Sequence, residues 1–150
     1  MIKLVRTNSE DPDFLELVRL LDAELKIIDG WEHSFYSQFN KLDNIKHVVL
    51  AYDDNIPVGC GAIKEYGEKM MEIKRMYVSP EKRNRGIASK ILSELEKWAG
   101  ELSCTKCILE TGVRQPDAIR LYMKNGYHSI PNWGQYIGVE YSVCFEKLIK

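Results

Sequence analysis

Glu72-Ile-Lys-Arg-Met-Tyr-Val-Ser-Pro-Glu-Lys-Arg-Asn-Arg-Gly-Ile-Ala-Ser-Lys-Ile-Leu92 is the stretch that decides the fold of this chain. Residues 71–78 are partly apolar and β-branched, which predicts a strand, and the proline of Ser79-Pro80 ends it because proline has no N–H to donate. From Ile87 onward the apolar residues recur at helical spacing, so a helix is expected there. The stretch therefore predicts a strand, a basic loop and a helix in that order.

The loop between that strand and that helix has the composition of an anion site. Gly86 lets backbone N–H groups approach a ligand closely, and the positive end of the helix dipole favours a phosphate or pyrophosphate. The residues alone leave open a solvated basic turn, which is common. Two other phosphate motifs do not fit: the chain has no G-x-x-x-x-G-K-[ST], and Gly59-Cys-Gly61 has Lys64 where a dinucleotide fingerprint needs its third glycine.

Two motifs resemble those of the GNAT N-acetyltransferases. Arg83-x-x-Gly86-x-Ala88 is similar to the acyl-CoA signature of that family, Q/R-x-x-G-x-G/A. Ala118-Ile-Arg-Leu-Tyr-Met-Lys-Asn-Gly-Tyr127 is similar to its second motif, A-x-x-L-Y-x-x-x-G-F/Y. The two occur in the family's order and spacing. The resemblance covers residues 45–148 well and the first 44 in outline.

The remaining segments predict an alternation of strands and helices. Asn8 and Ser9 are expected to cap a first helix that runs to about Ile28, and the aromatic segment 31–40 predicts a second short helix or a wall of the acceptor pocket. The strands are expected at 2–6, 47–52, 56–63, 71–78, 107–111, 127–130 and 139–148, and a further helix at 116–125.

The strand–helix–strand order around the basic loop predicts a right-handed crossover, so strands 71–78 and 107–111 should be parallel. Together with the resemblance this predicts an α/β fold: a single GNAT-type acyl-CoA N-acyltransferase domain over residues 1–150. Its sheet is expected to be mixed and mostly antiparallel, with a central parallel pair and helices on both faces.

Composition narrows the class of protein. The net charge is −1, so no overall field favours nucleic acid or an anionic membrane. No apolar run approaches the ~18 residues of a membrane span, and the N-terminus does not read as a signal peptide, so a cytoplasmic protein is expected. Four cysteines are then expected to be reduced. Cys104-Thr-Lys-Cys107 has zinc or redox spacing, but it opens an expected strand and lacks further ligands nearby, so no metal is predicted.

The resemblance implies acetyl-CoA as the co-substrate, bound where strands 71–78 and 107–111 separate. It implies that the pantetheine arm pairs with the strand backbone at Met76, Tyr77 and Val78. Gln115 stands where the family often has a cofactor-contacting asparagine. The pyrophosphate is expected on the loop and the first helical turn, at Arg83, Asn84, Arg85, Gly86, Ile87 and Ala88, with Ser89 and Lys90 nearby.

The resemblance also implies catalytic roles. Tyr122 stands at the family's general-acid position, where a phenol can protonate the leaving thiolate; otherwise it is a helix tyrosine packed on the sheet. Glu72 is the preferred base and Glu110 the alternative, and either could instead be a solvated or salt-bridged carboxylate. No cysteine is placed beside a base, so direct transfer is expected.

The sequence therefore predicts an enzyme that moves acetyl from acetyl-CoA to a primary amine of a small-molecule acceptor. The alternatives are a non-catalytic, regulatory acyl-CoA-binding module on the same fold, since fold does not fix function, and a binder of another phosphate ligand such as a nucleotide. Because the family often dimerises, a homodimer is a further expectation.

Overall fold

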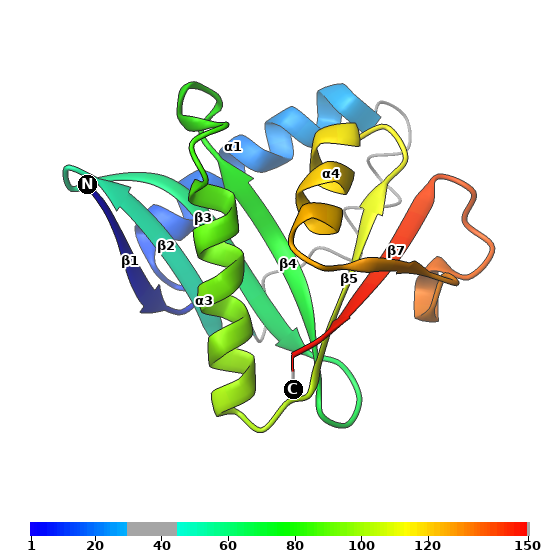
Figure 1. Cartoon of the computed structure of the whole chain (residues 1–150). Helices are drawn as coiled ribbons and strands as arrows, with labels where there is room; N and C mark the ends of the chain where they lie inside the picture. The colour runs from blue at the N-terminus through cyan, green and yellow to red at the C-terminus, as the bar shows by residue number, and fades with distance from the viewer. Residues whose placement is uncertain (30–44, 150) are drawn as a thin grey trace.

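The computed structural model describes residues 1–29 and 45–149, and a seven-stranded sheet forms the middle layer of that part (Figure 1). The strand order is β1-β2-β3-β4-β5-β7-β6. Only β4 and β5 are parallel, and every other neighbouring pair is antiparallel. The strands are β1 (Ile2–Thr7), β2 (His47–Asp53), β3 (Ile56–Glu65), β4 (Met70–Val78), β5 (Lys106–Gly112), β6 (His128–Ile130) and β7 (Ser142–Leu148).

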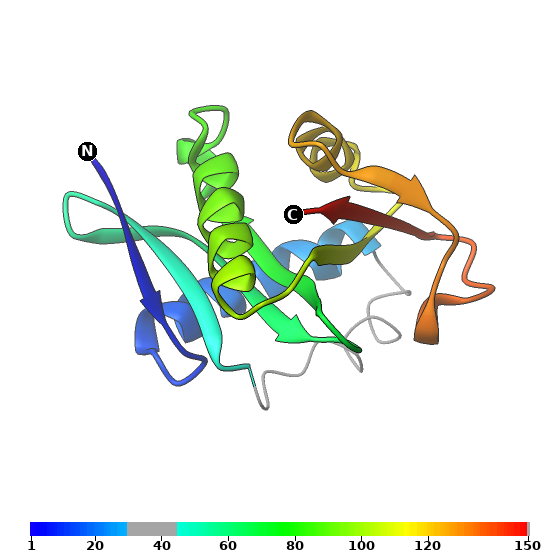
Figure 2. The ribbon, with the colours of Figure 1, turned by 60° about the horizontal axis from the view of Figure 1, so that its bottom comes forward.

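Helices cover both faces of this sheet. Helix α1 (Pro12–Asp29) lies on one face, whereas α3 (Ile87–Glu101) and α4 (Pro116–Lys124) lie on the other (Figure 2). Two separate apolar clusters fill the space between sheet and helices, one under α1 and one under α3 and α4. This confirms the predicted mixed α/β architecture with its central parallel pair. No helix within the described residues is long and apolar enough to cross a membrane.

The start of α1 differs from the expectation. The helix begins at Pro12, and the Asp11 carboxylate accepts the N–H of Asp13 at 2.9 Å, so Asp11 is the capping residue. Asn8 instead accepts the N–H of Glu10 in the preceding turn, at 2.9 Å. The prediction of Asn8 or Ser9 as the cap was therefore wrong by two or three residues, because proline at the first helical position moves the start of the helix to itself. The aromatic segment 31–40 lies outside the described residues.

Helix α3 lies very close to β3, and two glycines make this possible. A Cβ atom on Gly61 would come within 2.9 Å of the side chains of Ile91 and Leu95. A Cβ on Gly59 would come equally close to Ile91. Since real Cβ atoms do not approach that closely, α3 could not keep its place over alanines here. The close packing fixes the position of the N-terminal end of α3 relative to the sheet.

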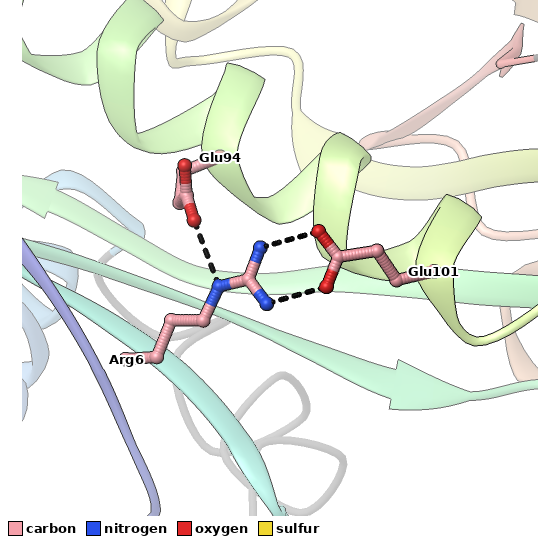
Figure 3. A network of polar contacts seen from close by, with 3 residues as sticks. All are labelled: Arg6, Glu94 and Glu101. Carbon is pink, nitrogen blue, oxygen red and sulfur yellow. Dashed lines mark hydrogen bonds and ion pairs between the residues drawn. The ribbon is translucent and has the colours of Figure 1, made fainter.

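The other end of α3 is tied to the edge strand β1 (Figure 3). The guanidinium of Arg6 donates to Glu94 at 2.7 Å and to both carboxylate oxygens of Glu101, at 2.7 and 3.0 Å. The same guanidinium lies 4.7 Å from the ring centroid of Trp98. A two-pronged pair of this kind is geometrically specific. It joins the first strand to the helix that carries the predicted anion site.

The parallel pair separates soon after it forms. Strand β4 pairs with β5 only from Met70 to Glu72, opposite Lys106–Ile108. Beyond that point the two strands diverge toward the N-terminal end of α3, as Figure 1 shows. Within β4 the pairing with β3 is also interrupted, because Lys74 to Tyr77 spans one residue more than the facing segment of β3, and Arg75 has a positive φ of 58°. The gap that opens between β4 and β5 therefore lies next to the bulge in β4.

Candidate active site

A pocket of about 560 Å³ opens where β4 and β5 diverge. Its walls come from the last residues of β4, the loop before α3, the first turn of α3, the C-terminal half of α1, and α4 with the loop before it. Ligand-binding crevices are typically found where parallel strands diverge, at the carboxyl ends of those strands. The predicted cofactor strand and the predicted anion loop thus face the same hollow.

The end of β4 offers backbone groups to this hollow. Ser79 donates its N–H to Val58 of β3 at 2.8 Å. Because successive strand residues direct their polar groups to opposite sides, Val78 directs its N–H and C=O away from β3 and into the gap. The side chain of Arg83 donates to this C=O at 2.8 Å, which agrees with that orientation. A ligand amide could therefore pair with β4 here as an added strand would.

The loop before α3 turns its backbone toward the same hollow. Asn84 and Gly86 have φ values of 64° and 80°, and only short or absent side chains adopt this left-handed region easily. Alternating backbone conformations of this kind make successive N–H groups converge. The N–H groups of Ile87, Ala88 and Ser89 lie in the first turn of α3, where a helix has no internal acceptors for them. The result is a backbone cradle for an anion.

Two basic side chains of the loop, Arg83 and Lys82, are bound to acidic partners. Arg83 donates to Glu24 of α1 at 2.7 Å and lies 5.5 Å from the ring centroid of Tyr77. Lys82 donates to Asp53 at 2.9 Å. Glu24 itself lines the pocket, so one wall carries a negative charge. The backbone cradle is therefore a feature for anion binding that does not depend on these two side chains.

Helix α4 closes the opposite side. Gln115 precedes its first turn, donates its N–H to Gly112 at 3.0 Å and lines the pocket. At the other end Asn125 donates to the Ser89 hydroxyl at 3.1 Å and to the C=O of Leu121 at 2.8 Å. Since Ser89 accepts from Asn125, its own O–H can be donated into the pocket.

A second pocket of about 110 Å³ adjoins the first and lies closer to the N-terminal half of β4. It is polar: Glu72, Lys74, Arg75, Glu110 and Tyr136 contribute to its lining. The two pockets meet at a shared wall, which we call the junction. The junction is formed by Leu21, Leu25, Met76, Gln115, Ala118 and Tyr122.

Burial controls the titration of the charged residues in the second pocket. The Lys74 ammonium lies 3.5 Å from the Glu72 carboxylate, and both side chains are more than nine-tenths buried. Burial raises the pKa of Glu72, while the nearby ammonium partly opposes that rise. Burial likewise lowers the pKa of Lys74. Both groups can therefore exchange protons closer to neutral pH than their isolated counterparts.

Tyr122 holds its proton firmly. Its ring is buried against Tyr127 and Phe145, with centroid distances of 5.8 and 6.5 Å. Burial, with a smaller effect of the Glu110 charge, raises the pKa of this phenol. The group is therefore a neutral O–H at the junction across the physiological range, as a proton donor must be.

The cysteines are poor nucleophiles. All four are buried and free, and burial raises the pKa of Cys60 and Cys107 to about 12 and that of Cys144 to about 11. The thiolate is the reactive form. Within residues 1–29 and 45–149, no group of three or more His, Cys, Asp or Glu side chains is arranged to hold a metal ion.

Comparison with known proteins shows to which family the chain belongs. The model of the acetyltransferase (GNAT) family matches residues 14–127. This chain belongs to the GNAT acetyltransferase family. An IAA acetyltransferase from Azospirillum brasilense is 37% identical over 104 residues, which are 66% of this chain and 65% of that relative, just under two thirds of its length.

Solved structures agree with this family. A proposed acyl-CoA N-acyltransferase from Klebsiella pneumoniae is 28% identical with a TM-score of 0.84, and the match covers 100% of this chain and 99% of that chain. The PaiA N-acetyltransferase of Thermoplasma acidophilum, solved in complex with coenzyme A, is 19% identical with a TM-score of 0.73 and 99% coverage of both chains. At this low identity, the similarity to the Thermoplasma acidophilum structure shows a shared fold only.

The GNAT fold brings most of the predicted site residues together. Arg85, and Lys90 that was expected nearby, are exposed and do not line the first pocket. Glu72 and Glu110 line the second pocket, and Tyr122 lies at the junction. The other predicted residues line the first pocket: Met76, Tyr77, Val78, Arg83, Asn84, Gly86, Ile87, Ala88, Ser89 and Gln115.

Glu24, Lys74, Arg75 and Tyr136 are among the residues of this site that were not found from the sequence. Lys74 could have been found, because it stands two residues after Glu72 on a strand and so shares its face. Glu24, Arg75 and Tyr136 carry no local signal. Glu24 reaches the site through the packing of α1, Arg75 through the bulge, and Tyr136 through the turn Gly134–Tyr136 that follows β6.

Proposed function

We propose that this chain transfers the acetyl group of acetyl-CoA directly to the amino group of a small acceptor. The observation that carries this proposal is the junction: the pocket with the backbone cradle and the pocket with the buried charges meet at Tyr122 and Met76. Acetyl-CoA would supply an activated thioester there. The chain has to hold that thioester, take a proton from the amine and return one to sulfur.

The first pocket fits a molecule with a diphosphate and an extended amide-bearing arm. The N–H groups at Gly86 to Ser89 would bind the diphosphate. The outward-facing N–H of Val78 would pair with an amide of the arm, with Met76 and Tyr77 flanking it. Gln115 would reach the arm from the α4 side. In this arrangement the arm points along β4 toward the junction.

The proton transfers fall to Tyr122 and Glu72. As the amine nitrogen bonds to the acetyl carbonyl carbon, the carbon–sulfur bond breaks and the Tyr122 O–H gives its proton to the leaving sulfur. Glu72, directly or through water, would take the proton that the amine loses. Its raised pKa makes it a stronger base than an exposed carboxylate. Glu110, in the lining of the same pocket, is the second candidate for this role.

Two measurements test this proposal together. Acetyl-CoA is titrated calorimetrically into the protein and into an Arg83→Glu/Gly86→Glu variant, and thiol release is followed with a panel of primary amines. We expect micromolar binding that is lost in the variant, and thiol release with some of the amines. The matched control is Lys97→Glu/Gly100→Glu, which changes the charge equally at the other end of α3 and should bind normally.

The outcomes separate the alternatives. Absence of binding to the intact protein would overturn the cofactor assignment and the activity with it. Binding without thiol release for any amine would point to a non-catalytic acyl-CoA-binding module. Competition by ATP with an affinity equal to that of acetyl-CoA would favour a general phosphate-ligand site.

A further inference from the structure

The Arg83 side chain connects two walls of the first pocket. Its Nε donates to the C=O of Val78 at the end of β4, at 2.8 Å, and its Nη2 donates to the Glu24 carboxylate of α1 at 2.7 Å. The guanidinium also lies 5.5 Å from the ring centroid of Tyr77. All four residues line this pocket. One side chain therefore bridges the space that we propose for acetyl-CoA.

The C=O of Val78 is a group that a bound arm would need. The N–H of Ser79 is donated to β3, so the polar groups of Val78 face the gap on the other side of β4. An amide that pairs with β4 as an added strand would reach this C=O from the gap. A carbonyl oxygen can accept two hydrogen bonds, but the guanidinium of Arg83 already lies at this one. The arm and the guanidinium therefore compete for the same place.

The carboxylate of Glu24 helps to hold the guanidinium there. Glu24 lies on α1 between Leu21 and Leu25, whose side chains also line the pocket. The side chains of the pair are 38% exposed for Arg83 and 31% exposed for Glu24. Ion pairs as exposed as this are weak, because water and salt screen them. A diphosphate can therefore take the guanidinium from Glu24, since phosphate oxygens accept well from a guanidinium.

The neighbouring cation of the loop is held differently. Lys82 pairs with Asp53 at 2.9 Å, and Asp53 does not line the pocket. This pair does not cross the proposed cofactor space, and it leaves the C=O of Val78 untouched. The two ion pairs of one loop thus allow a matched comparison.

We propose that Arg83 and Glu24 form a latch across the first pocket, and that the arm of acetyl-CoA pairs with β4 only after the guanidinium has left Glu24 and the C=O of Val78. This inference rests on the proposed binding of acetyl-CoA. On binding, the guanidinium moves to the diphosphate, and a ligand amide takes its place at Val78. The apparent affinity is then reduced by the fraction of molecules in which the latch is closed.

The first test is a double-mutant cycle on the affinity for acetyl-CoA, measured by calorimetry at low salt. Glu24→Gln keeps the size of the side chain and removes the charge that holds Arg83, so binding should tighten about threefold. In an Arg83→Met background, which has no latch to open, the same change should alter the affinity by less than about 1.5-fold. A threefold gain that persists in this background would come from charge repulsion alone and would overturn the proposal.

The matched control is Asp53→Asn. It frees Lys82, a cation of the same loop, without opening the latch, so the affinity for acetyl-CoA should change by less than about 1.5-fold. If freeing Lys82 tightened binding as much as Glu24→Gln does, release of any loop cation would suffice, and the latch would have no role.

The second test uses pantetheine, which carries the amide arm without a phosphate group. Arg83→Met removes the donor that competes for the C=O of Val78, so pantetheine should bind this variant about two- to threefold more tightly than the intact protein, by ligand-observed NMR. Equal or weaker binding would mean that Arg83 does not exclude the arm. Acetyl-CoA binding that is the same in the intact protein and in Glu24→Gln would overturn the latch alone. Absence of acetyl-CoA binding to the intact protein would overturn the cofactor assignment itself.

Discussion

The two pockets that meet at Tyr122 are built on different principles. The larger one presents backbone N–H groups from a continuous segment, Gly86–Ser89, and its nearby cations Lys82 and Arg83 are already bound to carboxylates. The smaller one presents buried charged side chains from β4 and the half-buried Glu110 from β5. Backbone groups recognise a feature common to many ligands, whereas side chains can differ between relatives that share the backbone.

This difference suggests a division of labour. In the proposed reaction the fold with its backbone cradle would bind the common co-substrate, and the side chains of the smaller pocket would decide which acceptor reacts. Changes at the junction should therefore affect the chemistry, changes in the cradle should affect cofactor affinity, and changes at Glu72 and Lys74 should affect the pH dependence of the reaction. The variants below each change a residue in one of these regions, so that its effect can be compared with the effects of the others.

The largest effect is expected at the junction. Tyr122→Phe removes the proton donor while keeping the ring packed against Tyr127 and Phe145. General acid catalysis typically contributes 10²–10⁴-fold, so we expect kcat to fall by about 10²- to 10³-fold. The affinity for acetyl-CoA, measured by calorimetry, should change by less than about threefold. A variant with nearly normal kcat would exclude Tyr122 as the acid.

The next effect concerns the base and its pH dependence. Because burial raises the pKa of Glu72 above its ordinary value of 4.5, kcat should rise with pH through an apparent pKa higher than that value. The Lys74 ammonium favours the ionised carboxylate, so Lys74→Met should move this limb to still higher pH. Glu72→Gln should lower kcat by about 10²-fold and abolish the limb. Persistence of the limb in Glu72→Gln would assign it to another group, with Glu110 as the first to test by Glu110→Gln.

The same division explains what the sequence could predict. The strand, the glycine and the first helical turn of the larger pocket are contiguous, so their pattern could be read from the sequence. The predicted mixed α/β architecture with its central parallel pair was confirmed. The smaller pocket is assembled from residues far apart in the chain. Tyr136 enters it through a turn held by the three hydrogen bonds of Asn132, and no local pattern encodes that.

Backbone irregularity limited the prediction in a second way. A regular strand would turn Arg75 away from Lys74, but the bulge changes the alternation, and Arg75 pairs with Asp22 of α1. The cap of α1 was misplaced for a different, local reason: Asn8 and Ser9 could each serve as a cap, but Pro12 sets the first helical position and makes Asp11 the cap. Hydrophobic periodicity finds elements, whereas single-residue shifts depend on tertiary packing.

A pair of glycine variants tests whether the cradle depends on backbone conformation. Gly86 has φ of 80° and Gly100 lies inside α3, and a Cβ on either would meet nothing within 4 Å. Gly86→Ala must place alanine in the left-handed region, which costs about 1–2 kcal/mol, so we expect acetyl-CoA binding to weaken by about tenfold. Gly100→Ala should raise the free energy of unfolding by about 0.5–1 kcal/mol without changing binding. Equal binding by both variants would argue against the cradle.

The smallest effect is expected from the acidic wall of the larger pocket. Glu24 pairs with Arg83 at 2.7 Å and lines the space proposed for a polyanion. Glu24→Gln removes a repulsive charge and frees the guanidinium, so acetyl-CoA should bind about threefold more tightly at low salt, with the gain shrinking as ionic strength rises. Glu16→Gln removes a carboxylate that pairs with Arg19 on the exposed side of the same helix, and it should bind as the intact protein does. Weaker binding in Glu24→Gln would mean that Glu24 orients Arg83 for the ligand, and the side chains would then share with the backbone the work of holding the diphosphate.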